Sequence, residues 1–460
     1  MRLHERIIAE LGLLSLVRAP RDTKLIILQR FTRFFAFGGS TIVLALYLHA
    51  LKLPDSQIGL FMSLALVGDV ISFGLALLAD GIGRKVVLGL GALLMVFSGV
   101  VFAFSGNFWV LLAAGVVGII SPNGREIGPF SAIEESTLAY LTSLEIRSDI
   151  FAWYTVIGSA GNAAGKLATG FIVQHLQTLG GWDQIRSYQA IFFAYAVLGA
   201  VNFLVTFSLS NEVELYGREE QRSNSGSGDE EPLISAMEDG EEGEERVREK
   251  RSLLPNISKE SRAIVFKLCC LFAVDSLASG LVPASWVTYF FYGKFSLEEG
   301  SLGTIFSVMA FLSAISSLVA ASLSKRIGLI RTMVFTHLPS AIFLMLIPVP
   351  SSLAGALVFL VLRSSLASMD IAPKAAFLSM VVLPGERTAV MGLISVVRTF
   401  SQSGGPVITG VLAQSGKFWV TFLVAGLLKA GYDLGFLAGF QSYKRKTDIE
   451  ILSDENAHDA

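Results

Sequence analysis

Ionisable side chains occur inside apolar stretches long enough to cross a membrane, and they are the first candidates for chemistry. The clearest case is residues 123–135, "NGREIGPFSAIEE", which closely follows the apolar run "FWVLLAAGVVGII". An ionised group in hydrocarbon costs free energy, so such residues face a wet cavity or each other and mark function by default. The prolines and glycines of this stretch weaken or kink a helix. We therefore expect Arg125 and Glu126 to face an aqueous substrate cavity near mid-depth; the alternative is a structural Arg–Glu pair without substrate contact.

A second group of charges lies in the second half of the chain. Asp370 follows Arg363 by seven residues and Lys374 follows Asp370 by four, so a continuous helix places all three within about 40° on one face. Glu134 precedes Lys374 by 240 residues, which is the offset of an internal repeat. We predict that these four residues bind the substrate together with Arg125 and Glu126. We also predict that Glu134 pairs with Lys374 across a central cavity. The alternative places Glu134 in water at the membrane interface.

Carboxyl groups without an evident partner could carry a proton. Asp69 stands alone in "LALVGDVISFG", and Asp275 stands in a similar apolar context. A buried carboxyl without a partner holds its proton more tightly and can be protonated at physiological pH. We expect Asp69, Asp275 and Arg33 to take part in proton coupling; the alternative is a structural Asp69–Arg33 ion pair. Lys166 and Arg398 either hold an anionic group or pair with a carboxylate of the spans.

The composition indicates that membrane-spanning helices hold these charges. The chain has 460 residues, of which 52% are hydrophobic and 16% are charged, and its mean hydropathy is +0.60. Soluble globular domains are about 25% charged. Apolar segments of about 20 residues, the length that crosses a bilayer, recur along the chain and predict an all-α membrane protein with twelve transmembrane helices. They lie at 27–50, 57–79, 85–105, 108–137, 150–174, 188–210, 263–291, 299–322, 331–348, 352–380, 388–412 and 417–440.

Lysines and arginines are concentrated in alternate loops, which places both termini in the cytosol. The expected order is a cytosolic N-terminal segment, a six-helix bundle, an acidic loop that composition predicts to be disordered, a second six-helix bundle and a cytosolic tail. Their boundaries are 1–24, 25–210, 211–262, 263–440 and 441–460.

Two short stretches of the middle loop resemble sorting signals. "DEEPLI" (229–234) and "EKRSLL" (249–254) fit an acidic-dileucine pattern. Sorting adaptors that read such a pattern would direct the protein to an endosomal or vacuolar membrane rather than the plasma membrane. The alternative is a plain solvated linker.

The two halves of the chain are related in sequence. Residues 146–172 align without gaps to residues 386–412, so that Arg147 matches Arg387 at an offset of 240. Internal symmetry of this kind is a sign of secondary transporters. It predicts that the twelve helices form two pseudo-symmetric six-helix bundles.

The turn after the second apolar segment carries a family motif. It reads "LALLADGIGRKVV" and contains Asp80, Gly83, Arg84 and Lys85 in the pattern Asp-basic-x-Gly-Arg-basic, although Gly81 replaces the first basic residue. With the six-plus-six arrangement and the long middle loop, the chain resembles the major facilitator superfamily over nearly its whole length. The resemblance implies that these four residues form a conformational latch between the halves on the cytosolic side.

The resemblance implies secondary active transport by alternating access. Residues 122–141 also resemble a branch of the superfamily from fungi, plants and bacteria, and that branch implies no particular substrate. We expect a small organic solute, proton coupling because several carboxyls lie within spans, and export of a metabolite or xenobiotic. The alternative is a non-transporting membrane sensor that signals through the middle loop.

Other classes of function find little support in the sequence. No nucleophile–base or metal-ligand cluster stands out among the spans, so an enzyme, a cofactor and a metal site are not expected. A net charge of −2 gives no indication of a nucleic-acid partner. The expected partners are the lipid bilayer, a small-molecule substrate and protons.

Overall fold

Helices make up all the regular structure that the computed structural model describes, which covers residues 13–77, 83–124, 130–211, 213, 259–382 and 386–458. Eight helices within these ranges are long and apolar enough to cross a membrane, and shorter apolar helices accompany them. The prediction of an all-α membrane protein is confirmed. The two sorting stretches of the middle loop lie outside the described residues.

The first bundle is built from the first half of the chain. Polar side chains cap helices at its short turns: Asn107 accepts hydrogen bonds from the backbone of Trp109 and Val110, and Asp183 accepts one from Arg186. Such caps satisfy the free N–H groups at a helix start. The helices are α2 (Leu13–Arg18), α3 (Arg21–Ala50), α4 (Asp55–Leu77), α6 (Arg84–Phe104), α7 (Phe108–Val117), α8 (Phe130–Leu141), α9 (Leu144–Thr178) and α10 (Gln184–Phe207).

The second bundle repeats this arrangement. Its last helix continues through the segment predicted as a tail and ends at His458. The helices are α12 (Lys259–Leu281), α13 (Ala284–Phe295), α14 (Glu299–Ile327), α15 (Leu329–Leu346), α16 (Leu353–Leu366), α17 (Ile371–Val381), α18 (Arg387–Ser403), α19 (Gly405–Gln414) and α20 (Phe418–His458).

Four of the twelve predicted spans are interrupted. The interruption that begins at 118 and is described as far as 124 was expected from the prolines and glycines of this stretch, and Gly124 there has a φ of +63°, which favours glycine. Pro283 separates α12 from α13, and Gly404 and Pro406 mark the junction of α18 and α19. The predicted continuity of 352–380 is wrong, because a turn separates α16 from α17. Joined across these breaks, the helices give six crossings in each bundle.

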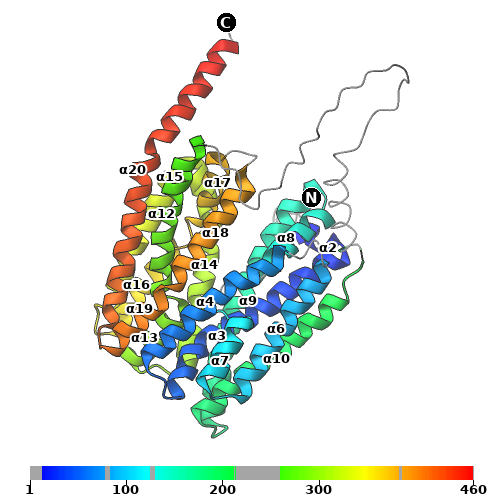
Figure 1. Cartoon of the computed structure of the whole chain (residues 1–460), viewed down its shortest axis with the longest axis vertical. Helices are drawn as coiled ribbons and strands as arrows, with labels where there is room; N and C mark the ends of the chain where they lie inside the picture. Colours follow the sequence, from blue (N-terminus) through cyan, green and yellow to red (C-terminus); the bar gives the residue numbers. More distant parts are fainter. Residues whose placement is uncertain are drawn as a thin grey trace, which may run out of the picture.

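The two bundles touch closely at one end of the molecule. Figure 1 shows α2 and the last turns of α20 at one end, here called the terminal end, and α13, α19 and the start of α4 at the opposite end. Near the opposite end α9 crosses α14 at Gly170 and Gly303, where an added Cβ on Gly170 would lie 2.8 Å from the Cα of Gly303. In the same way α4 crosses α19 at Gly59 and Gly410. Glycine lets two backbones approach this closely.

Large apolar side chains remain exposed on the outside of both bundles. Phe207 is 68% exposed, Phe266 70% and Phe400 72%. Water would disfavour a surface with many such groups, whereas lipid tails accept it. The outer surface therefore suits a bilayer, and polar groups are gathered inside.

Candidate functional site

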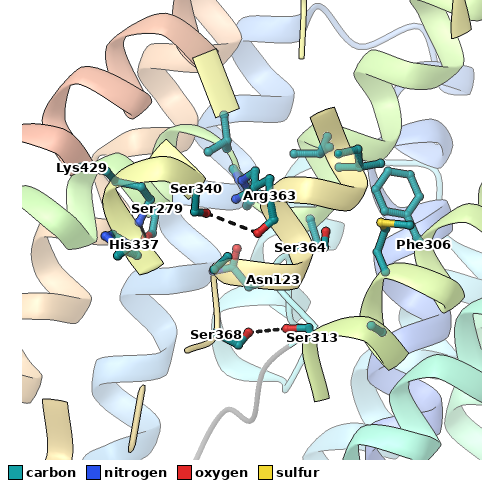
Figure 2. A pocket seen from close by; sticks show the side chains of 18 of the residues that line it. Asn123, Ser279, Phe306, Ser313, His337, Ser340, Arg363, Ser364, Ser368 and Lys429 are labelled. Atoms are coloured by element: carbon teal, nitrogen blue, oxygen red, sulfur yellow. Dashed lines mark hydrogen bonds between the residues drawn. The ribbon is translucent and has the colours of Figure 1, made fainter. Parts of the chain in front are cut away.

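A cavity with polar side chains in its lining lies between the bundles. It consists of two connected parts of about 240 and 690 Å³. Both parts are lined by Asn123 and Lys166 of the first bundle and by Ala310, Ser313 and Ser368 of the second. The hydroxyl groups of Ser313 and Ser368 are hydrogen-bonded to each other (Figure 2). These five residues form what we call the junction of the cavity.

The smaller part of the cavity is walled mainly by the second bundle. Ser279, His337, Ser340, Arg363 and Lys429 line it, and Figure 2 shows their side chains around the space. The Ser340 hydroxyl donates to the carbonyl oxygen of Arg363 at 3.3 Å. Of the predicted substrate-binding residues, Arg363 is thus placed at the cavity.

The larger part follows one face of α9 toward the terminal end. Asn162, Ser159, Thr155 and Ala152 line it at helical spacing. Arg30 of α3 lies opposite, and its guanidinium stands 3.7 Å from the centroid of the Tyr154 ring and 4.7 Å from that of Phe34. Aromatic faces hold a cation by electrostatic attraction.

The interrupted span between α7 and α8 is held by side chains from both bundles. The Asn162 amide donates to the carbonyl oxygen of Gly124 at 2.7 Å. Ser285 of α13 donates its hydroxyl to the carbonyl oxygen of Pro122 at 2.8 Å. Carbonyls freed by a broken helix need such donors in a membrane. This segment therefore joins the bundles beside the junction.

Glu134 is fully buried and engaged within its own bundle. Its two carboxylate oxygens accept from the two terminal nitrogens of Arg33, each at 2.7 Å, and one of them also accepts from the Tyr154 hydroxyl at 2.7 Å. The Arg33 guanidinium lies 4.2 Å from the centroid of the Phe130 ring. The expected Glu134–Lys374 pair is wrong for this conformation, and so is the placement of Glu134 in water. Arg33 pairs with Glu134 because α8 brings that carboxylate directly against α3.

Lys374 belongs to a buried charge network in the second bundle. Its ammonium lies 2.6 Å from Asp370 and 3.3 Å from Asp275. Lys429 donates to the other oxygen of Asp275 at 2.8 Å and to Ser279 at 2.9 Å. The expected common face of Arg363, Asp370 and Lys374 is lost, because the turn between α16 and α17 separates Arg363 from the other two.

A histidine completes the network. His337 Nδ1 lies 3.0 Å from Asp433, and its Nε2 lies 4.0 Å from Asp275. His337 was not among the residues predicted from the sequence. Its position in the middle of an apolar segment is the signal that could have identified it. Asp433 and Lys429 enter the network from α20 at helical spacing.

The main ion pairs of the two bundles occupy equivalent places with opposite polarity. At Gly38, α3 crosses α9 against Asn162, and at Gly280, α12 crosses α18 against Gln402. Asn162 and Gln402 are related by the internal repeat. Arg33 and Asp275 each lie five residues before the crossing glycine of their own helix. Their partners on α8 and α17 are repeat partners of each other. The first bundle thus has a base on its first helix and an acid on the fourth span, and the second bundle has the reverse.

Several of the predicted site residues belong to neither the described cavity lining nor the described charge network. Arg125, Glu126 and Asp80 lie outside the described residues, as does the side chain of Asp69. Lys85 Nζ donates to the carbonyl oxygen of Leu209 at 2.6 Å within the first bundle. The remaining latch candidates, Gly83 with a φ of +116° and the buried Arg84, stand at the start of α6.

Solved structures with a similar fold include transporters. The sequence profile of the Major Facilitator Superfamily matches residues 268–438. The uncharacterized membrane protein YJR124C of Saccharomyces cerevisiae is 33% identical over 449 residues, which are 96% of this chain and 98% of that protein. The nucleoside transporter NupG superposes with a TM-score of 0.65 at 14% identity, over 92% of this chain and 99% of its own. The xylose transporter XylE from E. coli superposes with a TM-score of 0.63 at 12% identity, over 91% and 99%. The chain belongs to the major facilitator superfamily.

Proposed function

We propose that the protein is a secondary transporter that moves a small organic solute by alternating access, here in the state that is open toward the terminal end. One observation carries this proposal: both bundles line the cavity, while their close glycine crossings lie near the opposite end. Rocking of the bundles about a central site is the way in which this architecture moves a solute. Lys166 lies one helical turn from Gly170, where α9 of the first bundle crosses α14 of the second. The junction therefore lies at the closed end of the cavity.

Further contacts between the bundles support a closed opposite end. Tyr289 of α13 donates to Asp55 of α4 at 2.9 Å, and Tyr188 of α10 donates to Glu299 of α14 at 2.6 Å. With the termini in the cytosol, as the distribution of lysine and arginine predicts, the cavity loads from the cytosol. This state suits export of a cytosolic metabolite or xenobiotic.

Proton coupling is assigned to the buried network of the second bundle. Three carboxylates, those of Asp275, Asp370 and Asp433, face two ammonium groups, so a neutral His337 leaves one uncompensated negative charge. A net charge buried in hydrocarbon costs several kcal/mol. We propose that the network takes up one proton to balance its charge and that release of this proton to the cavity is coupled to solute movement.

Neighbouring charged or titratable groups complete the surroundings of this proton. Tyr432 lies against His337, with 5.9 Å between ring centroids, and Arg363 lines the same cavity. Arg398 of α18 lies 5.8 Å from the centroid of Phe272. Asp275 and Asp69 remain predicted participants, Asp275 through its two lysine partners.

The test uses purified protein in liposomes, a panel of metabolites and an imposed pH gradient. We expect the gradient to drive solute movement, because a proton and the solute share one conformational cycle. His337→Gln and Asp433→Asn should abolish the effect of the gradient and retain solute exchange without it. The matched control is the exposed His175→Gln. Gradient-driven transport that survives both substitutions contradicts the coupling assignment, and absence of solute-specific flux throughout the panel contradicts the transporter and favours a sensor.

A further inference from the structure

We propose that the solute is an anion with a carboxylate or phosphate group, and that Lys166 receives this group at the junction of the cavity. The inference rests on the proposed transport function and names the chemical class of its substrate. Its basis is the charge and the hydrogen-bonding partners of the residues that line the junction.

Lys166 differs from Lys374 and Lys429, the buried lysines of the second bundle. Lys374 and Lys429 each contact a carboxylate. Lys166 is half-buried, lines both parts of the cavity, and makes neither a hydrogen bond nor an ion pair with any residue that the structure describes. A lysine ammonium inside a membrane protein normally has a charged or carbonyl partner. We infer that a bound solute supplies this partner.

Helix architecture does not explain the lysine. In the second bundle the repeat position is Pro406, which begins α19 beside a break. A lysine keeps α9 continuous, as would any residue other than proline, so the ammonium group is not needed for the helix. Its cost in an apolar region is compensated when an anion binds.

The neighbours of Lys166 at the junction suit an oxyanion. Asn123 supplies an amide, and Ser313 and Ser368 supply hydroxyl groups that can turn to donate. Hydrogen bonds to an ionised oxygen are roughly twice as strong as those between neutral groups. Because these donors come from both bundles, a bound anion interacts with both and changes the balance between the two conformations.

Two further side chains of the described lining, Arg30 and Arg363, have the same sign as Lys166. Lys429 and His337, which also line the cavity, are paired with Asp275 and Asp433. Neither aspartate nor glutamate lines either part among the residues that the structure describes. A cavity with low-dielectric walls and one sign of charge concentrates ions of the opposite sign. The cavity as described therefore favours anions over cations.

The test compares Lys166→Gln with the wild-type protein and with the exposed Lys417→Gln as matched control. The probes are succinate with its uncharged diamide, glycerol 3-phosphate with glycerol, and a wider set of such pairs, at constant ionic strength. We expect anions to raise the melting temperature of the wild-type protein and their uncharged counterparts to leave it unchanged. Lys166→Gln should weaken anion binding by about tenfold or more, and Lys166→Arg should retain most of it.

The protein without added solute gives a second, independent readout. Lys166→Gln should raise its melting temperature, because the substitution removes an unpaired charge. A fall in that temperature shows that the ammonium has a structural partner and overturns the proposal. Equal binding of uncharged compounds, or unchanged anion binding by Lys166→Gln, overturns it as well. Anion binding without flux in liposomes refutes the transport function alone, while flux of a neutral or cationic solute refutes the anion assignment alone.

Discussion

One buried ion pair in each bundle follows the internal symmetry. The Arg33–Glu134 pair of the first bundle and the Asp275–Lys374 pair of the second occupy equivalent places with reversed polarity. The position on the first helix has a base in one bundle and an acid in the other, and the partner position has the opposite charge in each. The fold therefore requires an oppositely charged pair at these positions, and either orientation of the pair satisfies it. A charge without its partner is far more costly than no pair at all.

Removal of one member of the first pair should therefore destabilise the protein strongly. We predict that Glu134→Gln or Arg33→Gln lowers the free energy of unfolding by about 3–5 kcal/mol. The double exchange Arg33→Glu with Glu134→Arg should recover much of this loss, as the reversed pair of the second bundle suggests. Thermal unfolding of the purified protein measures both.

The control for this prediction is an exposed ion pair. Arg186 and Asp183 lie 3.8 Å apart with side chains 78% and 61% exposed. Arg186→Gln should change stability by no more than about 1 kcal/mol. A loss at Glu134 no larger than that of the control would contradict the structural role of the buried pair.

The presence of charged residues inside the spans could be read from the sequence, but their pairing could not. Arg33, Glu134, Asp275, Asp370 and Lys374 were all found by searching the apolar spans for charge. Pairing depends on which faces of neighbouring helices meet, and sequence spacing describes one helix only. The turn before α17 is an example, because Lys374 after the turn does not point in the direction that a continuous helix from Arg363 would give it.

At the level of helices, the close crossings between bundles depend on glycine. On Gly170 an added Cβ would overlap the carbonyl oxygen of Glu299 and crowd the Cα of Gly303. We predict that Gly170→Val prevents closure of the opposite end and shifts the protein to the other conformation, with loss of transport. In this variant, a cysteine introduced by Ser368→Cys should react with a membrane-impermeant thiol reagent from the opposite side of the membrane.

The matched control is Gly431→Val on α20, where an added Cβ meets no atom within 4 Å. It should leave both transport and accessibility unchanged. If Gly170→Val protein is folded, by its melting temperature, and transports normally, the crossing does not control the closed end.

Hydropathy located the spans, and the interruptions within them were harder to predict. The break after α7 had prolines and glycines as signals, and Gly404 and Pro406 mark the one before α19. The turn between α16 and α17 contains neither residue type between Ala367 and Asp370. The local signal lies just after the turn: Pro373, in the first turn of α17, has no backbone N–H, and in a continuous helix its ring would clash with the carbonyl of Met369.

At the scale of the whole molecule, the repeat in the sequence was sufficient to predict two related bundles. It was not sufficient to predict which conformation the protein adopts, because both states use the same helices and differ only in how the bundles meet. The contacts at Gly170, Gly59 and Tyr289 supply that information. These contacts place the closed end of the molecule opposite the termini. The cavity lies between these contacts and the terminal end.

The proposed transport requires that both bundles share a water-filled cavity that opens to alternate sides. The most direct measurement is labelling of a single cysteine at Ser368 by a membrane-impermeant thiol reagent, in protein whose native Cys269 and Cys270 are replaced by serine. We predict reaction from the side of the termini in the resting protein, and from the opposite side when transported solute and a pH gradient are present. If Ser368→Cys reacts from neither side under any condition, the cavity is closed to water and the account is contradicted.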